Sequence, residues 1–218
     1  MPITGHGWEF QVQRLGHHRL GNDVRSYGSY QVFIDGSPQP AQNGVPLNGF
    51  VCEAPGPGQN HPPQGSHPRI EPGRYPLATQ FGPRYRSIGY STDTHVAAQL
   101  HMPGVAFDDN FTGARSAILI HPGHPAKVGD PPFTFLASIG CFNLTRPLQP
   151  SEDMEFFESR LRVIALINNL AAFRPAAFKD AHGHPIMHNT PITDAFAVVE
   201  GDSTTILQPA PVVVASNN

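Results

Sequence analysis

The sequence has few charged residues, few cysteines and no long apolar run. Only 14% of its residues are Asp, Glu, Lys or Arg, and the formal net charge is -3, whereas an average domain has roughly 25% charged residues. This balance provides no basic field for binding phosphates, so no nucleic acid partner is expected. No apolar run reaches the roughly 18 residues that a membrane-spanning helix needs. The first ten residues lack the basic and apolar regions of a signal peptide, so none is expected.

Cysteine is limited to Cys52 and Cys141, which lie 89 positions apart. One potential pair is not a disulfide framework, so each residue is considered as a separate thiol. Cys52 lies in a short apolar segment and is expected to be structural. A disulfide between the two would abolish any thiolate chemistry at Cys141.

Glycine, proline and phenylalanine are plentiful. Gly (21) and Pro (24) make up about a fifth of the 218 residues, and 14 Phe residues can supply a core. A chain of this length is expected to form one domain with elaborations, or one and a half domains. The composition predicts a mostly β protein that is rich in loops, not a disordered chain.

Alternating apolar and polar residues predict strands near the N-terminus, at residues 8–14 and 29–35. Residues 15–28 between them are expected to form a turn. The run Phe50-Val51-Cys52 predicts a further strand. Together these elements predict a small antiparallel β unit.

Proline and glycine dominate residues 54–68, which predicts a loop because such residues deny the backbone helix and sheet hydrogen bonds. A strand is expected at 74–79, with Pro76 placing it at a sheet edge. Residues 116–121, Ser-Ala-Ile-Leu-Ile-His, form an apolar run between turn signals and predict a buried strand.

One long helix is predicted over residues 152–172. Ser151 is a suitable N-cap, acidic residues follow it, and Arg174-Pro175 ends the pattern. Residues 191–208 are expected to form a closing hairpin. Apolar residues recur at helical spacing and predict the buried face of the helix: Phe157, Leu161, Ile164, Ile167 and Ala171.

The residues best suited to chemistry are His121 and Cys141. His121 ends the predicted buried strand, and a spacer of sixteen residues separates it from the segment Ser138-Ile139-Gly140-Cys141-Phe142-Asn143. A loop that folds back would bring the imidazole to the thiol, and a cysteine attacks carbonyls well once a histidine takes its proton. Gly140 permits a tight turn in which the amides of Gly140 and Cys141 could stabilise an oxyanion.

This pattern resembles the signature of YkuD-type L,D-transpeptidases: His, a spacer of this size, Ser or Thr, His, Gly, Cys, a hydrophobic residue, and Asn or Arg. After the spacer, five of six motif positions match. Upstream, Ile70-Glu-Pro-Gly-Arg-Tyr-Pro-Leu77 is similar to the Thr-Pro-x-Gly-x-Tyr segment of that domain. The resemblance covers roughly residues 68 to 172.

The resemblance implies a curved sheet or sandwich of the L,D-transpeptidase type, with one long helix and a β-rich N-terminal extension. The domain division it suggests is an extension at 1–53, a Pro/Gly loop at 54–68, a catalytic domain at 69–208 and a tail at 209–218.

It also implies an enzyme acting on peptidoglycan stem peptides. Cys141 would attack the carbonyl of the third stem residue, expel a terminal D-amino acid and form a thioester, which an amine, water or a free D-amino acid resolves. His121 would be the base, Gly140 and Cys141 the amide donors, and Ser138 a brace of the turn. Asn143 and His124 are expected to contact substrate. No cofactor is expected.

The sequence departs from the family at Ile139, where a second histidine is usual. Carboxypeptidase or D-amino-acid exchange activity, or a role as an antibacterial toxin, fits as well as transpeptidation. Without a signal peptide, the expected route to the periplasm or cell wall is non-classical or contractile export. An immunity protein would then be a partner.

Two other functions stay open. A non-enzymatic module that binds the cell wall or serves a structural role would keep the fold without the chemistry, and Ile139 favours it. A zinc-dependent hydrolase is the other alternative, because the sequence has 12 His residues. The candidate ligands are His121 with His124, or a cluster of His182, His184 and His188 completed by Asp180 or Asp194. Neither cluster shows the HExxH pattern, so no metal site is assigned.

Overall fold

The computed structural model describes residues 4–21, 23–56, 58–61, 69–81, 103–123 and 140–201. Its elements are, in chain order, β1 (Trp8–Leu20), β2 (Asp23–Ile34), β3 (Ser37–Pro38), β4 (Ala41–Gln42), β5 (Val45–Pro46), β6 (Asn48–Glu53), β7 (Gly73–Gln80), β8 (Gly104–Phe107), the 3-10 helix η1 (Asp109–Phe111), β9 (Leu119–His121), β10 (Phe142–Thr145), α2 (Phe156–Phe173), α3 (Pro175–Phe178) and β11 (Pro191–Glu200).

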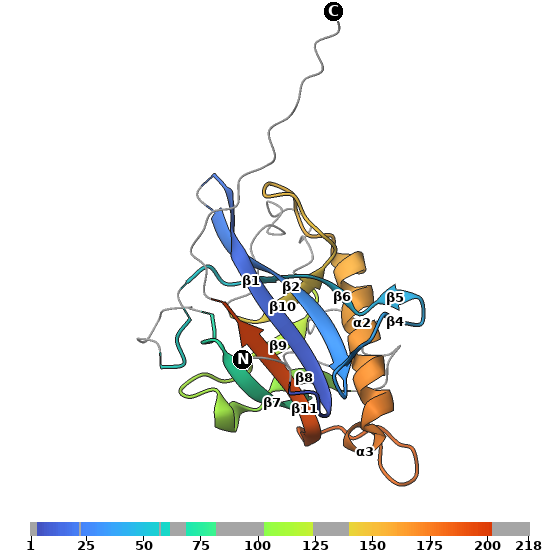
Figure 1. The fold of residues 1–218 in the computed structure, drawn as a ribbon. Coiled ribbons are helices and arrows are strands. Elements are labelled where there is room, and N and C mark those ends of the chain that lie inside the picture. The colour runs from blue at the N-terminus through green and yellow to red at the C-terminus, as the bar shows by residue number, and fades with distance from the viewer. Residues whose placement is uncertain are drawn as a thin grey trace, which may run out of the picture.

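Nine strands form one sheet in the order β1-β11-β7-β8-β9-β10-β6-β2-β3, and β1 also pairs with β2. That last pairing closes the sheet on itself, and its curvature is visible in Figure 1. The pairs β1–β11 and β9–β10 are parallel, and the other pairs in this sheet are antiparallel. The prediction of a mostly β fold with one long helix is confirmed.

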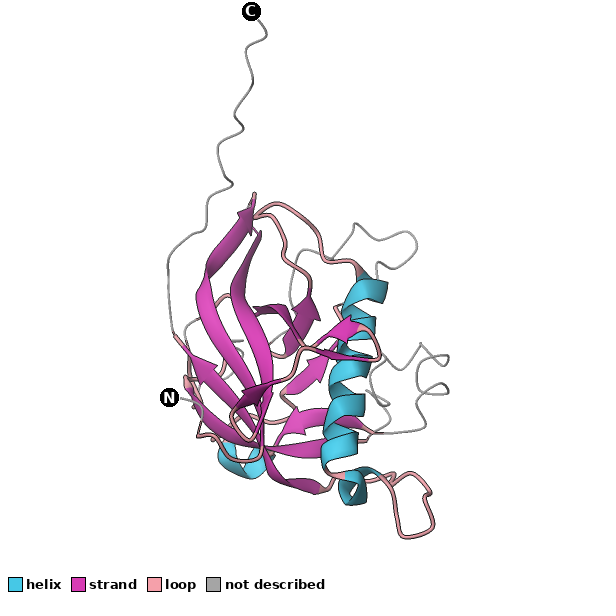
Figure 2. Ribbon diagram, turned by 45° about the vertical axis from the view of Figure 1, so that its right-hand side comes forward, coloured by secondary structure: helices cyan, strands magenta, loops and turns pink. Residues whose placement is uncertain are grey.

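The main core lies on the concave inner face of the sheet. Alternate residues of β1, Trp8, Phe10 and Val12, are fully buried there, as period-two alternation requires. Helix α2 packs beside the strands on the same core, as Figure 2 shows. The indole nitrogen of Trp8 donates a 2.7 Å hydrogen bond to Asn169 Oδ1 on α2, which satisfies a polar group that burial would otherwise leave unpaired.

The turn expected at residues 15–28 was wrong. Both strands of the hairpin continue through this segment to Leu20 and Asp23, with a bulge between Arg14 and Gly16. Its polar residues hid the alternation, because His18 and Arg25 are buried on the strands and bonded to each other, with Arg25 Nη2 3.2 Å from His18 Nδ1.

The start and the buried face of the long helix also differ from the prediction. Its N-cap is Glu155, whose carboxylate accepts hydrogen bonds from the amides of Phe157 and Glu158, and not Ser151. Phe157 and Leu161 are 64% and 54% exposed, respectively. The buried apolar face consists of Val163, Ala165, Leu166, Ile167 and Leu170. The helix ends at Phe173, before Pro175, as expected.

Strand β7 confirms the strand expected at 74–79, but it lies between β11 and β8 and not at an edge. Pro76 is tolerated there because the β7–β11 register shifts between Pro191 and Phe196, and β7–β8 pairing begins only at Leu77. The apolar run at 116–121 forms a strand only over its last three residues, β9.

Residues of the expected N-terminal extension, 1–53, and of the expected catalytic domain, 69–208, share this one sheet, since β1 lies between β11 and β2. The first part of the expected hairpin at 191–208 is β11, and its second part lies outside the described residues. No helix among the described residues is long and apolar enough to cross a membrane.

Candidate active site

His121 and Asn143 lie side by side on the outer face of the sheet. The parallel strands β9 and β10 place Ile120 beside Phe142 and His121 beside Asn143. Ile120 and Phe142 belong to the main core, so their neighbours His121 and Asn143 project to the opposite side. Both are buried, with exposures of 7% and 0%. The strand end and the cysteine segment therefore meet, as the sequence pattern predicts.

Cys141 immediately precedes β10, and its sulfur lies at the start of β9. Leu119 N donates a hydrogen bond to Sγ over 3.3 Å, and Sγ lies 3.6 Å from the carbonyl oxygen of Ala117. His121 follows Leu119 by two residues on β9. The backbone positions that hold the thiol and the imidazole, Leu119 and His121, are therefore roughly 7 Å apart along this strand. Cys141 is partly exposed and forms no disulfide.

The two backbone groups have different effects on the sulfur. An N–H donor, here Leu119 N, is accepted better by a thiolate than by a thiol, whereas the Ala117 carbonyl can bind only the protonated thiol. Ala117 itself has φ +54°, a conformation uncommon for a residue other than glycine. Its amide donates a 2.8 Å hydrogen bond to Asp109 Oδ1, which holds the residue in this conformation.

The shortest contact of the His121 imidazole indicates which ring nitrogen carries the proton. Nδ1 lies 2.6 Å from the carbonyl oxygen of Pro122, and since a carbonyl only accepts, Nδ1 is the nitrogen that carries the proton. In the neutral ring Nε2 is then the nitrogen able to accept a proton. The amide of Asn143 braces this arrangement, because Nδ2 donates to the carbonyls of His121 at 3.0 Å and Pro122 at 3.2 Å.

Arg115 is a charged residue of the site that the sequence pattern did not reveal. Burial lowers the pKa of this guanidinium, and the negative charge of a Cys141 thiolate acts in the opposite direction. The two groups are thus close enough to interact electrostatically. Arg115 lies outside the His-spacer-Cys motif, so no spacing rule could identify it.

Two residues link this region to the helix: Ser159 lies on α2, and Met154 lies in the segment before it. Gly123 N donates a 3.0 Å hydrogen bond to Ser159 Oγ, which in turn donates to the carbonyl of Leu144 on β10. The thioether of Met154 packs directly on Gly123, so close that a Cβ there would lie 2.4 Å from the sulfur. These contacts hold the strand exit after His121 against β10.

Cys52 is structural, as expected. It pairs with Asn143 in the sheet and packs with Tyr27, Leu148 and Met154 in a second apolar cluster on the outer face. It is fully buried, and that burial raises the pKa of the thiol to about 11. Its sulfur is therefore protonated and inert at neutral pH.

The remaining predicted residues are only partly described. Gly140 is buried and has φ +94°, where a side chain would be strained, and the turn expected around it extends into residues that lie outside the described ranges. Ser138, Ile139 and His124 lie outside the described residues.

The described histidines that were considered as zinc ligands do not form a metal-binding cluster. His184 Nδ1 lies 3.4 Å from Asp180 Oδ2 on an exposed loop, and the His182 and His184 rings are 6.1 Å apart. Asp194 instead pairs with Arg174. Within the described ranges, no group of three or more His, Cys, Asp or Glu residues could hold a metal ion.

Comparison of the chain with protein-family models, curated proteins and solved structures gives no match. The motif spacing and the geometry around Cys141 are therefore the observations that bear on function.

Proposed function

We propose that this protein is a cysteine-dependent enzyme of peptidoglycan stem peptides, an L,D-transpeptidase or an L,D-carboxypeptidase or D-amino-acid exchange enzyme with the same thioester intermediate. The observation that carries the proposal is that Cys141, just before β10, and His121, on the adjacent parallel strand β9, lie on one face of the sheet, with the sulfur at the start of β9 and the imidazole at its end, where Nδ1 is bound to Pro122. This leaves Nε2 as the proton acceptor of the ring. His121 lies two residues after Leu119, whose amide contacts the Cys141 sulfur.

In the proposed reaction, His121 takes the thiol proton and Cys141 Sγ attacks the carbonyl carbon of the third stem residue. The C–S bond forms, the C–N bond to the terminal D-amino acid breaks, and the leaving amine takes the proton from the imidazolium. An amine, a water molecule or a free D-amino acid then attacks the thioester, and the thiolate leaves with the bonding electrons. The positive charge of Arg115 stabilises the Cys141 thiolate both before it attacks the substrate and after it leaves the thioester.

The substrate class fixes the proposed place of action as the periplasm or the cell wall. A toxin delivered by non-classical or contractile export, with an immunity protein as its partner in the producing cell, is one form of this proposal.

The test is incubation of tetrapeptide muropeptides with the protein. Terminal D-alanine should be released, and intact-mass spectrometry after rapid acid quenching should detect an acyl adduct on the protein. Cys141→Ala should abolish both signals, whereas the matched variant Cys52→Ala should retain them. Activity that persists in Cys141→Ala and disappears with a chelator would replace this proposal with the zinc hydrolase.

A wall-binding or structural module is the second candidate, and one observation favours it. The Cys141 sulfur already has two backbone neighbours, Leu119 N and Ala117 O, as a purely structural thiol would. Binding to purified sacculi without release of D-alanine, unchanged in Cys141→Ala, would establish the module and overturn the enzyme.

A further inference from the structure

The segment before α2, residues 147–154, is held by the outer end of the β1–β2 hairpin. Arg25 Nη2 donates hydrogen bonds to the carbonyl oxygens of Glu152 at 2.7 Å and Gln149 at 3.4 Å. Leu148 N donates a 3.1 Å hydrogen bond to the hydroxyl of Tyr27. In Figure 1 this segment is the gold loop between the end of the hairpin and the start of α2. Two side chains of β2 therefore fix a loop that is distant in the sequence.

The same segment supports the residue that follows the proposed catalytic base. Met154 is 3% exposed and belongs to the same apolar cluster as Tyr27. Its sulfur lies so close to Gly123 that a Cβ there would be 2.4 Å away. Gly123 comes directly after Pro122, whose carbonyl oxygen accepts the hydrogen bond from His121 Nδ1. A displacement of the segment would therefore remove the support behind the His121 imidazole.

His18 supplies the acceptor that keeps Arg25 in place. Its Nδ1 lies 3.2 Å from Arg25 Nη2, and because a guanidinium only donates, Nδ1 is unprotonated in this arrangement. The His18 ring is 1% exposed and is stacked on Tyr27, with the ring centroids 3.9 Å apart. A proton on Nδ1 would remove the hydrogen bond and put a second positive charge beside the guanidinium. The network is therefore compatible only with a neutral His18.

His18 is the member of this network that gains charge in mild acid. Burial raises the pKa of Tyr27 to about 12 and that of Cys52 to about 11, so both are neutral at low pH. Glu53 is paired with Arg14, and a hydrogen bond to Arg146 lowers the pKa of Glu152. The titratable and charged groups that face His18 or its partners come from three elements: Arg25 and Tyr27 on β2, Cys52 and Glu53 on β6, and Glu152 before α2.

We propose that these contacts form a pH-sensitive clamp on the proposed catalytic site. While His18 is neutral, Arg25 and Tyr27 hold the segment before α2, and Met154 supports Gly123. When His18 is protonated, Arg25 moves away from it and the segment detaches together with Met154. As a control on catalysis the clamp rests on the proposed function, but its movement can be measured without turnover.

The sign and the size of the response follow from the two states of His18. Burial, and next the charge of Arg25, lowers the pKa of His18 to about 4 in the held state, whereas 6.5 is the ordinary value that release restores. The held state is therefore favoured above pH 6.5 and loses its advantage as the pH falls toward 4. Between pH 7 and pH 4.5 the ratio of held to released molecules should fall by at most roughly 60-fold.

The test follows the backbone amide shift of Gly123 and the ring shifts of His18 by NMR between pH 7 and pH 4. Gly123 should show a titration step with the same midpoint as the His18 ring. This step should persist in His121→Gln, which removes the neighbouring imidazole. It should disappear in His18→Gln, which keeps an acceptor for Arg25 that does not titrate.

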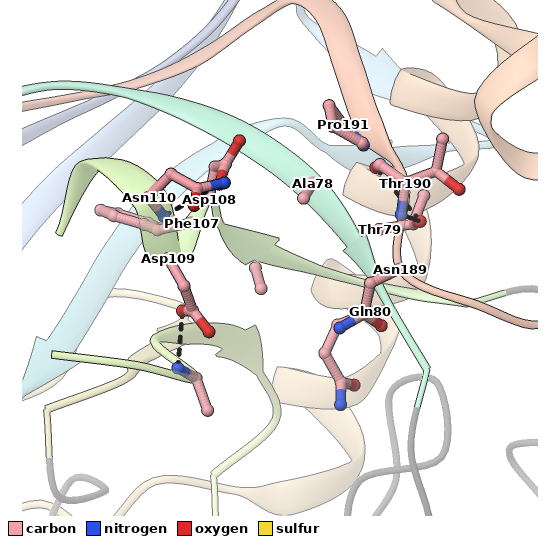
Figure 3. Close-up of a pocket in the computed structure, with 12 residues that line it drawn as sticks. Ala78, Thr79, Gln80, Phe107, Asp108, Asp109, Asn110, Asn189, Thr190 and Pro191 are labelled. Carbon is pink, nitrogen blue, oxygen red and sulfur yellow. Dashed lines mark hydrogen bonds between the residues drawn. The ribbon is translucent and has the colours of Figure 1, made fainter.

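A variant of the linking residue separates transmission from titration. In Met154→Ala the His18 ring should still titrate, but Gly123 should no longer follow it, and Met154→Leu should restore most of the step. The cavity of about 280 Å³ in Figure 3 provides the control, because none of its described lining residues belongs to this network. The amide shift of Thr79 in its wall should have the same pH dependence in the wild type and in His18→Gln.

Two results would overturn the clamp: a Gly123 step that follows His121 alone, or a His18 ring that titrates at its ordinary value of 6.5. If His18→Gln does not fold, the wild type, His121→Gln and Met154→Ala decide the question. Failure of the proposed function is distinguishable, since a protein with the linked titration that releases no D-alanine would retain the clamp and not the enzyme.

Discussion

The imidazole Nδ1 of His121 lies 2.6 Å from the carbonyl oxygen of Pro122, the next residue in the chain. A histidine that donates to its own following peptide cannot rotate or change tautomer without losing this bond. Asn143 adds to the constraint by donating to the carbonyls of both residues. The base of the proposed reaction is thus oriented by a backbone carbonyl group, a role that a carboxylate often has beside a catalytic histidine.

Replacing His121 with Gln should lower kcat/KM for D-alanine release by about 10²- to 10⁴-fold, because a positioned general base contributes that much. The rate is measured with tetrapeptide muropeptides across pH 5 to 9. The variant should also lose the acidic limb of the profile. His182→Gln, on an exposed loop, is the matched control and should behave as the wild type. A rate for His121→Gln within threefold of the wild type would remove His121 from the mechanism.

The two cysteines should differ sharply in reactivity. Burial raises the pKa of Cys52 to about 11, so at pH 8 only about one molecule in a thousand carries that thiolate. Iodoacetamide at pH 8 should therefore add one adduct per chain by intact mass. Cys141→Ala should give none, and Cys52→Ala should still give one. Two adducts on the folded wild type would show that Cys52 is accessible.

The sequence predicted the parts of the fold that depend on local pattern. Alternation located β1 and β2, and Phe50-Val51-Cys52 located β6. The outer part of the first hairpin was missed because its buried residues are His18 and Arg25, and burial of a polar group depends on partners distant in the sequence. The pairing of β1 with β11 links residues almost 190 positions apart, which no local pattern encodes.

The spacing of His121 and Cys141 in the sequence predicted that they lie in one site, because the motif marks a histidine at the end of a strand and a cysteine directly after a glycine. Arg115, Ala117 and Ser159 were not identified. The Ser159 hydroxyl bonds to backbone groups of other segments, and the backbone of Ala117 bonds to the side chains of Cys141 and Asp109. Nothing in an Ala or Ser within the sequence reports such a contact. Arg115 contributes through a charge whose distance from Cys141 depends on the folded loop.

Helix α2 provides a direct stability test of its observed face. Leu166 is fully buried and Leu161 is 54% exposed. Leu166→Ala should lower the free energy of unfolding by about 2–5 kcal/mol through lost burial and a cavity. Leu161→Ala should change it by no more than about 0.5 kcal/mol. Urea denaturation monitored by circular dichroism measures both, and comparable losses for the two variants would contradict the helix orientation.

Stability should fall in mild acid partly because of His18. Burial, and next the charge of Arg25, lowers the pKa of His18 to about 4 from 6.5. The unfolded chain therefore binds a proton between these values while the folded chain does not, so this contribution is complete above pH 6.5 and is lost as the pH falls toward 4. The loss is at most about 3 kcal/mol.

The measurement for His18 is urea denaturation at pH 7 and pH 4.5 for the wild type and His18→Gln. The glutamine variant will be less stable at pH 7, because it loses the ring stacked on Tyr27 at 3.9 Å. Its decline between the two pH values should nevertheless be smaller than that of the wild type. An identical decline in both proteins would mean that His18 titrates normally.

Arg115 should control the reactivity of the Cys141 thiolate. Burial lowers the pKa of Arg115, and the thiolate raises it, which by reciprocity means that the guanidinium stabilises the thiolate. Arg115→Gln should therefore slow alkylation of Cys141 by iodoacetamide at pH 7 by roughly threefold to tenfold. Arg115→Lys keeps the charge and should retain most of the rate. Arg19→Gln, at an exposed position, controls for the change in net charge.

The rates should converge above the pH at which the thiol is fully ionised, since Arg115 then has no protonation equilibrium left to shift. A difference between wild type and Arg115→Gln that persists undiminished at that pH would show that Arg115 limits access to the sulfur instead of favouring its ionised form.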